Sequence, residues 1–369
     1  MIQGSTNVGW IQMATTSADI FFSTNVTASG VTTQPWCLYP YIRRLAFPDT
    51  LANRISFIIQ VPIMLSLTIV GLTGNALSFI VIGKETRKNS NSFLLQSLAV
   101  LDNAVLLIYA VYISLSGIYP YTGKMIGYYE IHQYMDRYLF FTSMALKTAA
   151  IYMIVLVTAE RYIAVCLPLR AKSLCTVMNA RIAVFILCLV CFLYNIPTVF
   201  QVQLWMVKEP CSGLLKPYSS MSEFRLTNIY FTVIYVHTMY YVLKFLVPVG
   251  IMLYMNFHLV RSLRAATNMQ SQKPADSNRR QTQATTITRR VLAVSVVFIS
   301  LEFPAVLLNF IYLVSQSLTT NESELSRYVG RLMVTTYILQ TINSLVNFYI
   351  YVLTGKSFRR TMRQVLCCG

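Results

Sequence analysis

Residues 138–170 read YLFFTSMALKTAAIYMIVLVTAERYIAVCLPLR, an apolar segment that ends in the charged pair Glu160–Arg161 followed by Tyr162. About 20 apolar residues of helix cross the hydrocarbon core of a bilayer, so this segment is long enough to span one. The charged pair is then expected near one membrane face, where ionisable groups are costly unless they have a partner. A salt-bridged helix end that meets the lipid headgroups explains the pair equally well.

The composition of the 369-residue chain is that of a membrane protein, with 55% hydrophobic and only 12% charged residues. Soluble domains carry about 25% charged residues. The formal net charge of +17 raises the question of nucleic-acid binding. The basic residues, however, gather in short segments between apolar runs, and no aromatic and basic recognition motif is present. We therefore expect a lipid bilayer as a partner and no nucleic acid.

The sequence contains seven long apolar runs, counting the first stretch. They cover residues 55–83, 93–115, 138–170, 181–200, 235–260, 291–314 and 328–353. Prolines inside several of these runs are compatible with membrane helices, because neighbouring helices satisfy the backbone groups that a proline frees. The predicted fold class is an all-α membrane protein, a seven-transmembrane helix bundle.

The charge distribution predicts how the chain crosses the membrane. Lys and Arg are concentrated in the connectors on one side, which places that side in the cytosol and the amino terminus outside. Residues 1–53 are then an extracellular tail, 54–354 the transmembrane domain and 355–369 a cytosolic segment. The sequons at Asn25 and Asn321 both fall outside and are predicted glycosylation sites. Residues 1–25 lack the basic and apolar regions of a signal peptide, so no cleavable one is expected.

The last residues predict a short amphipathic helix on the cytosolic membrane surface. Its apolar face comprises Phe358, Met362, Val365 and Leu366, and the basic residues fall mostly on the other face. Cys367 and Cys368 follow directly. Cysteines behind such a helix are palmitoylation candidates, and free cytosolic thiols are the alternative.

Taken together, these features resemble a rhodopsin-like (class A) G-protein-coupled receptor over residues 55–366. The resemblance rests on Gly74-Asn75, Leu98-Ala99-Val100-Leu101-Asp102, Glu160-Arg161-Tyr162, Pro248, Phe298 six residues before Pro304, and Asn347-Phe348-Tyr349-Ile350-Tyr351. Residues 171–176, 194–197 and 343–348 further resemble invertebrate receptors for FMRFamide-type neuropeptides.

The resemblance implies a switch at the cytosolic face. In the family, the arginine equivalent to Arg161 binds the neighbouring acid, here Glu160, at rest and contacts a heterotrimeric G protein when the sixth helix swings out. Tyr162, Asn347 and Tyr351 fall in motifs of the same switch. A charge pair that can exchange partners suits such a two-state element.

Two further sets of residues receive roles from the resemblance. Asp102, Asn343, Ser344 and Asn347 match a polar cluster around a sodium ion, which is the only cofactor the resemblance implies. The serine that usually completes this cluster is Ala150 here. Ile151, Pro248 and Phe298 match an apolar triad that repacks on activation, and ordinary interhelical packing predicts the same contacts.

The chain departs from the family pattern in the middle of the bundle. Glu302 stands where the sixth helix usually has a tryptophan, and Lys147 faces that position from the third helix. A Glu and a Lys buried separately are each costly, so we predict that they form an ion pair at the pocket floor, with Lys244 as a third candidate member. The alternative is that Lys147 reaches water while Glu302 is neutral.

A second departure concerns the extracellular disulfide. Asp136 replaces the cysteine that the family carries at the top of the third helix, so the usual bridge cannot form. Cys37 and Cys211 are the cysteines expected outside. An exposed thiol is unfavourable in an oxidising compartment, so we predict that these two pair.

The function implied is that of a plasma-membrane receptor for an extracellular peptide, and no catalytic constellation or metal-ligand motif indicates an enzyme. Amine receptors carry an aspartate at the position of Ser143, so an amine ligand is disfavoured. Opsins carry the lysine that binds retinal at the position of Thr341, so an opsin is disfavoured as well. Glu130 and Asp136 lie among tyrosines of the outer segments and suit the arginine and aromatic of an amidated peptide. An interfacial aromatic belt explains those tyrosines equally well. A non-signalling seven-helix scaffold is the main competitor, and a transporter would show internal repeats.

Overall fold

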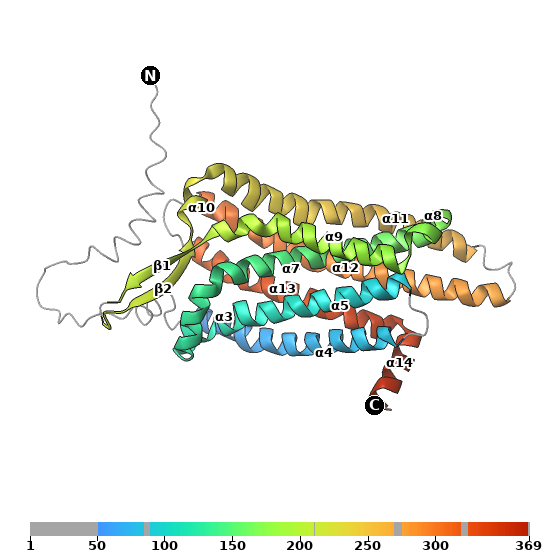
Figure 1. Ribbon diagram of the computed structural model, residues 1–369, viewed down its shortest axis with the longest axis horizontal. Helices are drawn as coiled ribbons and strands as arrows, with labels where there is room; N and C mark the ends of the chain where they lie inside the picture. The colour runs from blue at the N-terminus through green and yellow to red at the C-terminus, as the bar shows by residue number, and fades with distance from the viewer. Residues whose placement is uncertain (1–50, 85–88, 210, 269–274, 319–323, 368–369) are drawn as a thin grey trace, which may run out of the picture.

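The structure is a computed structural model of the 369-residue chain and describes residues 51–84, 89–209, 211–268, 275–318 and 324–367. In these residues, seven long helical segments run side by side along the long axis of the molecule (Figure 1). In chain order they are α3 (Leu51–Ile58) with η1 (Ile59–Ile63) and α4 (Met64–Gly83), α5 (Ser90–Tyr109) with η2 (Ala110–Leu115), α7 (Ile126–Cys166), α9 (Val177–Asn195), η4 (Phe231–Met239) with η5 (Val242–Leu246) and α11 (Val247–Asn268), α12 (Ala275–Leu318) and α13 (Glu324–Thr354).

Short elements join the long helices or cap the bundle. They are α6 (Ile118–Thr122), α8 (Pro168–Leu174), the 3-10 helix η3 (Ile196–Gln201), α10 (Glu223–Thr227) and α14 (Lys356–Cys367). The predicted C-terminal amphipathic helix is α14, which turns away from the bundle axis in Figure 1. Arg359 holds it against the end of α13 by donating hydrogen bonds to the carbonyls of Val352 (2.7 Å) and Leu353 (2.9 Å).

The helices are long and apolar enough for a membrane. Within the described residues, six helical segments combine sufficient length with strongly apolar composition. The remaining long helix, α13, has 31 residues. At 1.5 Å per residue it extends for about 46 Å, which exceeds the roughly 30 Å of a hydrocarbon core. The predicted all-α, seven-helix membrane fold is confirmed.

The segment that follows α9 and η3 contains the strands of the described residues, none of which was predicted. It forms an antiparallel hairpin of β1 (Val202–Lys208) and β2 (Leu215–Met221), with Val202 opposite Met221 and Lys208 opposite Leu215. The hairpin projects from the end of the bundle where α3 begins, whereas α8 and α14 lie at the opposite end (Figure 1). We call these the hairpin end and the α14 end.

Several predicted helix boundaries were wrong. The third helix, α7, begins at Ile126 rather than at residue 138, so Glu130, predicted in an outer segment, belongs to this helix, and so does Asp136, which was predicted at its top. The helix ends at Cys166 rather than at residue 170. The sixth helix, α12, begins at Ala275 rather than at residue 291. Polar residues at helix ends that extend past the bilayer hide the true boundary from a hydropathy pattern.

The helix α7 is the centre of the bundle. It packs against α5, α9, α11 and α12, and carries more buried residues than other described helices. The main apolar core lies toward the α14 end and contains the fully buried side chains of Leu98, Met153, Met252 and Phe298. Polar side chains lie along α7 on both sides of this core, toward the hairpin end and toward the α14 end. These are the groups that could respond to a ligand or a partner.

Candidate functional site

The charged pair at the α14 end is held by a third residue. Nε of Arg161 donates a hydrogen bond to Oε2 of Glu160 at 2.7 Å, and Oε1 of Glu160 accepts one from Oγ of Ser90, also at 2.7 Å. Glu160 and Ser90 are buried. Both carboxylate oxygens are therefore engaged, which fixes Arg161 against its own helix. Ser90 was not predicted, because a serine at the start of α5 carries no sequence signal for a partner on α7.

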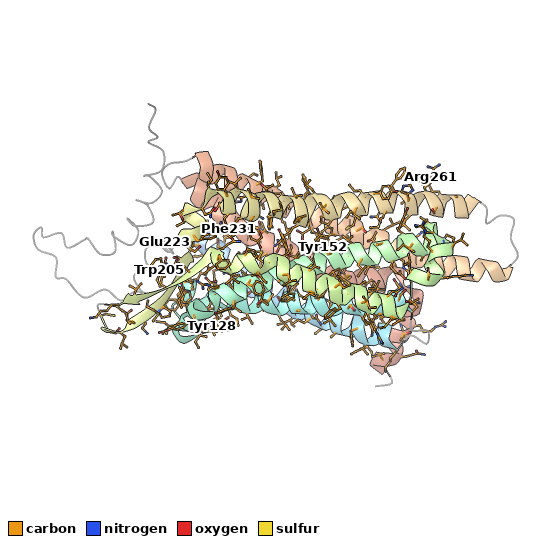
Figure 2. The ribbon with its side chains drawn as sticks, turned by 45° about the horizontal axis from the view of Figure 1, so that its top comes forward. Tyr128, Tyr152, Trp205, Glu223, Phe231 and Arg261 are labelled. Carbon is orange, nitrogen blue, oxygen red and sulfur yellow. The ribbon has the colours of Figure 1, made fainter. Side chains whose placement is uncertain are left out.

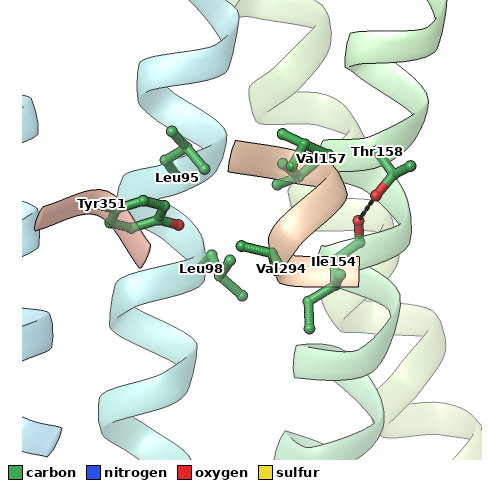
Figure 3. A pocket seen from close by; sticks show the side chains of 8 residues that line it. Leu95, Leu98, Ile154, Val157, Thr158, Val294 and Tyr351 are labelled. Atoms are coloured by element: carbon green, nitrogen blue, oxygen red, sulfur yellow. Dashed lines mark hydrogen bonds between the residues drawn. The ribbon is translucent and has the colours of Figure 1, made fainter. Parts of the chain in front are cut away.

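The apolar core next to this pair contains a small cavity between the helices. Its volume is about 10 Å³, at the lower limit for a single water molecule. Figure 3 shows Tyr351 of α13 with Leu95 and Leu98 of α5 on one side, and Ile154, Val157, Thr158 and Val294 on the other. The dashed line is the bond from Thr158 to the carbonyl of Ile154. Tyr162 lies outside this space and contacts the rings of Tyr254 and His258.

The predicted polar cluster is present around Asp102. Nδ2 of Asn347 donates to Oδ2 of Asp102 at 2.7 Å, and Asn75 of α4 donates to the carbonyl of Ser344 at 3.1 Å. Asp102, Ser344 and Asn347 are buried, and the predicted member Asn343 is half-buried. Oxygen ligands suit a hard cation, but α7 presents the methyl group of Ala150 and Asp102 already accepts a bond. A sodium ion here stays a prediction.

The predicted apolar triad lies where the helices meet. Ile151 and Phe298 belong to the same buried cluster, with 3% and 0% of their surfaces exposed. Pro248 is buried near the start of α11, and Pro304 lies inside α12. These buried positions are expected both for ordinary interhelical packing and for a triad that repacks on activation.

The predicted ion pair in the middle of the bundle is present. Nζ of Lys147 lies 2.7 Å from Oε1 of Glu302, and both side chains are buried. Lys147 therefore does not reach water, as the alternative with a neutral Glu302 required. Paired charges in a low-dielectric interior offset part of each other's desolvation cost, so this pair ties α7 to α12.

Lys244 does not join that ion pair. Its ammonium donates to Oδ1 of Asn195 at 3.2 Å and lies 5.3 Å from the ring centre of Tyr240. Asn195 in turn donates to Oγ1 of Thr148 at 3.1 Å.

The residues that hold Lys244 were not predicted, and neither was the bond of 2.5 Å from the Tyr109 hydroxyl to Gln340 on α13. Ordinary polar residues within apolar runs give no sign of their partners.

A larger cavity opens at the hairpin end. Its volume is about 330 Å³. It is lined by Gln60, Ser116, Gly117, Pro120, Tyr121, Tyr129, His132, Gln133, Asp136, Tyr218 and Ser219. Figure 2 shows that Tyr128 and Trp205 lie at this end of the molecule, far from Arg261 at the α14 end. Of the predicted ligand-binding residues, Asp136 lines the cavity. The Ser143 hydroxyl instead donates to the carbonyl of Phe140 on its own helix at 2.8 Å.

The hairpin is attached to α7 by polar side chains. Oε1 of Gln133 accepts hydrogen bonds from the backbone N–H and the hydroxyl of Ser219, at 2.9 and 2.8 Å. Nε of Arg137 donates to the Val202 carbonyl at 2.8 Å, and Lys216 forms an ion pair with Glu130 at 2.9 Å. We call these three contacts the hairpin clamp. The hydrogen bond to Glu130 raises the pKa of the Lys216 ammonium, which favours its charged form.

Cys211, at the turn of the hairpin, is disulfide-bonded. Its predicted partner Cys37 lies outside the described residues, as do Asn25, Asn321 and Cys368. Cys367 is the last residue of α14. The pairing with Cys37, the glycosylation sites and the palmitoylation sites therefore stay predictions.

Comparison with known proteins agrees with this arrangement of helices. The family model for 7 transmembrane receptors of the rhodopsin family matches residues 74–351. An FMRFamide receptor from Drosophila melanogaster is 32% identical over 311 residues, which cover 84% of this chain and 54% of the relative. The FMRFamide peptide receptor frpr-18 from Caenorhabditis elegans is 26% identical over 313 residues, covering 83% of this chain and 69% of the relative.

A third relative, sex peptide receptor-related protein 2 from Caenorhabditis elegans, is 23% identical over 238 residues, covering 60% of this chain and 51% of the relative. The chain thus spans about half the length of two of these three relatives. The family match nevertheless extends from α4 to the end of α13 and includes Asp102, Glu160, Arg161 and Tyr351. This chain belongs to the rhodopsin family of seven-transmembrane receptors.

Proposed function

We propose that this protein is a plasma-membrane receptor, with its amino terminus outside, that couples an extracellular peptide to a heterotrimeric G protein. The observation that carries the proposal is the position of Arg161. It is held at the α14 end by Glu160, which Ser90 also contacts, while a polar cavity lies at the opposite end of the same helix, α7. One rigid element thus connects a candidate ligand site with a candidate switch.

The orientation of the bundle supports this assignment. The α14 end carries exposed basic side chains such as Arg170, Arg264 and Arg360, and basic residues favour the cytosol. The hairpin end then faces the extracellular space, where the Cys211 disulfide is chemically stable. In this orientation a G protein would approach Arg161 and Tyr162, and a ligand would approach the cavity.

The mechanism follows from two arrangements of the same contacts. At rest, Glu160 holds Arg161, and the core around Phe298 fills the space between α7 and α12. Movement of α12 would open the cytosolic end and let Arg161 exchange Glu160 for the G protein. The Lys147–Glu302 pair lies between the cavity and this core, so we assign it the role of the ligand-sensitive connection. A ligand can shift the equilibrium only by binding the active arrangement more tightly.

The ligand class rests on the relatives and on the cavity. Two relatives are named for FMRFamide, and the cavity combines tyrosines with a carboxylate. We therefore propose an amidated peptide with aromatic and basic residues. An amidated end carries no negative charge, so it adds no repulsion against Asp136.

The test is G-protein activation by Phe-Met-Arg-Phe-amide and a library of related amidated peptides, in cells that express the chain. We expect activation in the wild type and its loss in Arg161→Ala. Arg170→Ala is the matched control, because Arg170 is exposed on α8, and it should respond as the wild type does. A peptide that binds without any G-protein response in the wild type would favour the non-signalling scaffold instead.

A further inference from the structure

We propose that His132 and Asp136 form a subsite for the cationic side chain of the ligand, a guanidinium in particular. This inference rests on the proposed function, because it assigns a part of the ligand to a part of the cavity at the hairpin end. The subsite comprises His132 and Asp136, with Tyr129 and Tyr218 beside them in the wall of the cavity.

The size of the cavity suits a side chain of a larger ligand. Ligand pockets generally measure about 300–1,000 Å³, so the 330 Å³ here is near the lower limit. The hairpin contributes Tyr218 and Ser219 of β2 to the wall, and α7 contributes Tyr129, His132, Gln133 and Asp136. A peptide would therefore place one or two side chains in this space and leave the rest outside it.

Asp136 brings an uncompensated negative charge to this wall. Within the described part of the chain, no lysine or arginine forms an ion pair with its carboxylate, and its polar neighbours are His132 and the hydroxyls of Tyr112, Tyr129 and Tyr337. Glu130, the other acid predicted at this end, differs because Lys216 neutralises it at 2.9 Å. A half-buried carboxylate without a cation favours a cationic ligand over a neutral or anionic one.

His132 supplies a second acceptor on the same face of α7. Its Nε2 lies 3.1 Å from the Tyr112 carbonyl, which can only accept a hydrogen bond, so Nε2 is the donor. In the neutral ring Nδ1 is then an acceptor. Among the described residues Nδ1 is buried and has no hydrogen-bond partner, and His132 lines the cavity while only 8% exposed. A buried acceptor without a donor indicates that a donor is missing from the site.

Several other polar side chains of the wall already have partners among the described residues. Gln60 donates to the Ile113 carbonyl and accepts from the Tyr121 hydroxyl, Gln133 accepts from Ser219, and Ser116 donates to the Tyr112 carbonyl. The Asp136 carboxylate and His132 Nδ1 remain as acceptors for a ligand, beside the hydroxyl groups of the tyrosines in the wall. Residues four apart on a helix lie on one face, so a single ligand group can meet both.

A guanidinium matches this pair of acceptors better than an ammonium does. It carries five N–H donors in a planar fork, so it can donate to Asp136 and to His132 at the same time. Its flat face can also rest on a tyrosine ring, and Tyr129 and Tyr218 line the same space. The structure therefore favours an arginine side chain of the ligand at this position.

The first test measures thermal unfolding of the purified full chain with Arg-Phe-amide or with citrullinyl-Phe-amide, in which a neutral urea replaces the guanidinium. We expect Arg-Phe-amide to raise the Tm of the wild type and the citrulline analogue to raise it less, because binding to the folded state stabilises it. Asp136→Asn should abolish the difference and Asp136→Glu should retain it. Glu223→Gln on α10 is the matched control and should behave as the wild type, because Glu223 is exposed and does not line the cavity.

The second test compares signalling by Phe-Met-Arg-Phe-amide and its citrulline analogue. A charged hydrogen bond accounts for roughly a 10- to 100-fold preference, so we expect the wild type and Glu223→Gln to prefer arginine by this factor. Asp136→Asn and His132→Phe should weaken that preference. Equal stabilisation of the wild type by both dipeptides would overturn the subsite. Stabilisation that depends on Asp136 without any signalling would leave the subsite standing and overturn the proposed receptor function.

Discussion

The Lys147 ammonium on α7 and the Glu302 carboxylate on α12 lie 2.7 Å apart inside the bundle, although 155 residues separate them in the chain. Removal of one partner leaves the other buried and uncompensated, which typically costs about 3–5 kcal/mol. We expect Lys147→Met and Glu302→Gln each to lower the Tm in detergent and the amount of protein at the cell surface.

The double variant Lys147→Met/Glu302→Gln leaves no isolated charge at this position, so it should be more stable than either single variant. The measurement is a double-mutant cycle on the free energy of unfolding, with a coupling of about 2 kcal/mol or more. Additive effects of the two substitutions would show that the two groups do not depend on each other.

Ser90 should restrain the resting state through Glu160. Ser90→Ala removes a hydrogen bond of 2.7 Å to a buried carboxylate, and bonds to charged groups contribute about 1.5–3 kcal/mol. If this bond exists only at rest, its loss shifts the equilibrium toward the active arrangement, and we expect roughly a tenfold increase in ligand-independent G-protein activation. Ser173→Ala, at an exposed serine of α8, is the control. A drop in basal activity at equal expression would contradict the assignment.

The contacts of the hairpin clamp should differ in strength. Gln133→Ala leaves the Ser219 N–H and hydroxyl without their acceptor, at a cost of about 1–3 kcal/mol. Lys216→Ala removes a more exposed ion pair, which is worth about 0–1 kcal/mol. Hydrogen exchange of the β2 amides should therefore accelerate strongly in Gln133→Ala and only slightly in Lys216→Ala. Equal acceleration would contradict this order, because the ion pair would then hold the strand as firmly as Gln133 does.

Gly74 should be intolerant of any side chain. A Cβ atom at this position of α4 would lie 2.9 Å from the ring of Phe348 on α13, closer than side-chain atoms normally approach. Close helix packing at small residues stabilises membrane bundles, so Gly74→Ala should lower the Tm by several degrees. Gly250→Ala on α11 is the control, since nothing lies within 4 Å of its added Cβ. Phe348→Ala removes the ring, so Gly74→Ala should cost less stability in that background than in the wild type; equal losses in both backgrounds would show that the clash is not the cause.

The sequence predicted those parts of the site that depend on position along one helix. Glu160–Arg161 follows an apolar run of known length, which places this pair near one membrane face. Lys147 lies a fixed number of helical turns before Arg161, so its depth in the membrane could be calculated as well. Its pairing with Glu302 followed from the high cost of two separate buried charges. These predictions needed only helix geometry and electrostatics.

The parts that were missed depend on contacts between distant segments. Ser90 and Asn195 are ordinary polar residues, and nothing in their spacing marks Glu160 or Lys244 as partners. The β-hairpin was missed because β2 contains Pro217, which argues against a strand, and neither strand shows a regular alternation of apolar and polar residues. The early start of α7 was hidden because residues 126–137 are polar and aromatic.

The hairpin clamp also determines how this protein should respond to its redox surroundings. In the described ranges, α7 and the hairpin are joined through Gln133, Arg137 and Glu130, and Asp136 occupies the place where related receptors carry a bridging sulfur. A thiol reductant has no bond to cleave between these two elements. Dithiothreitol would act on the Cys211 disulfide at the tip and leave the base of the hairpin seated on the bundle.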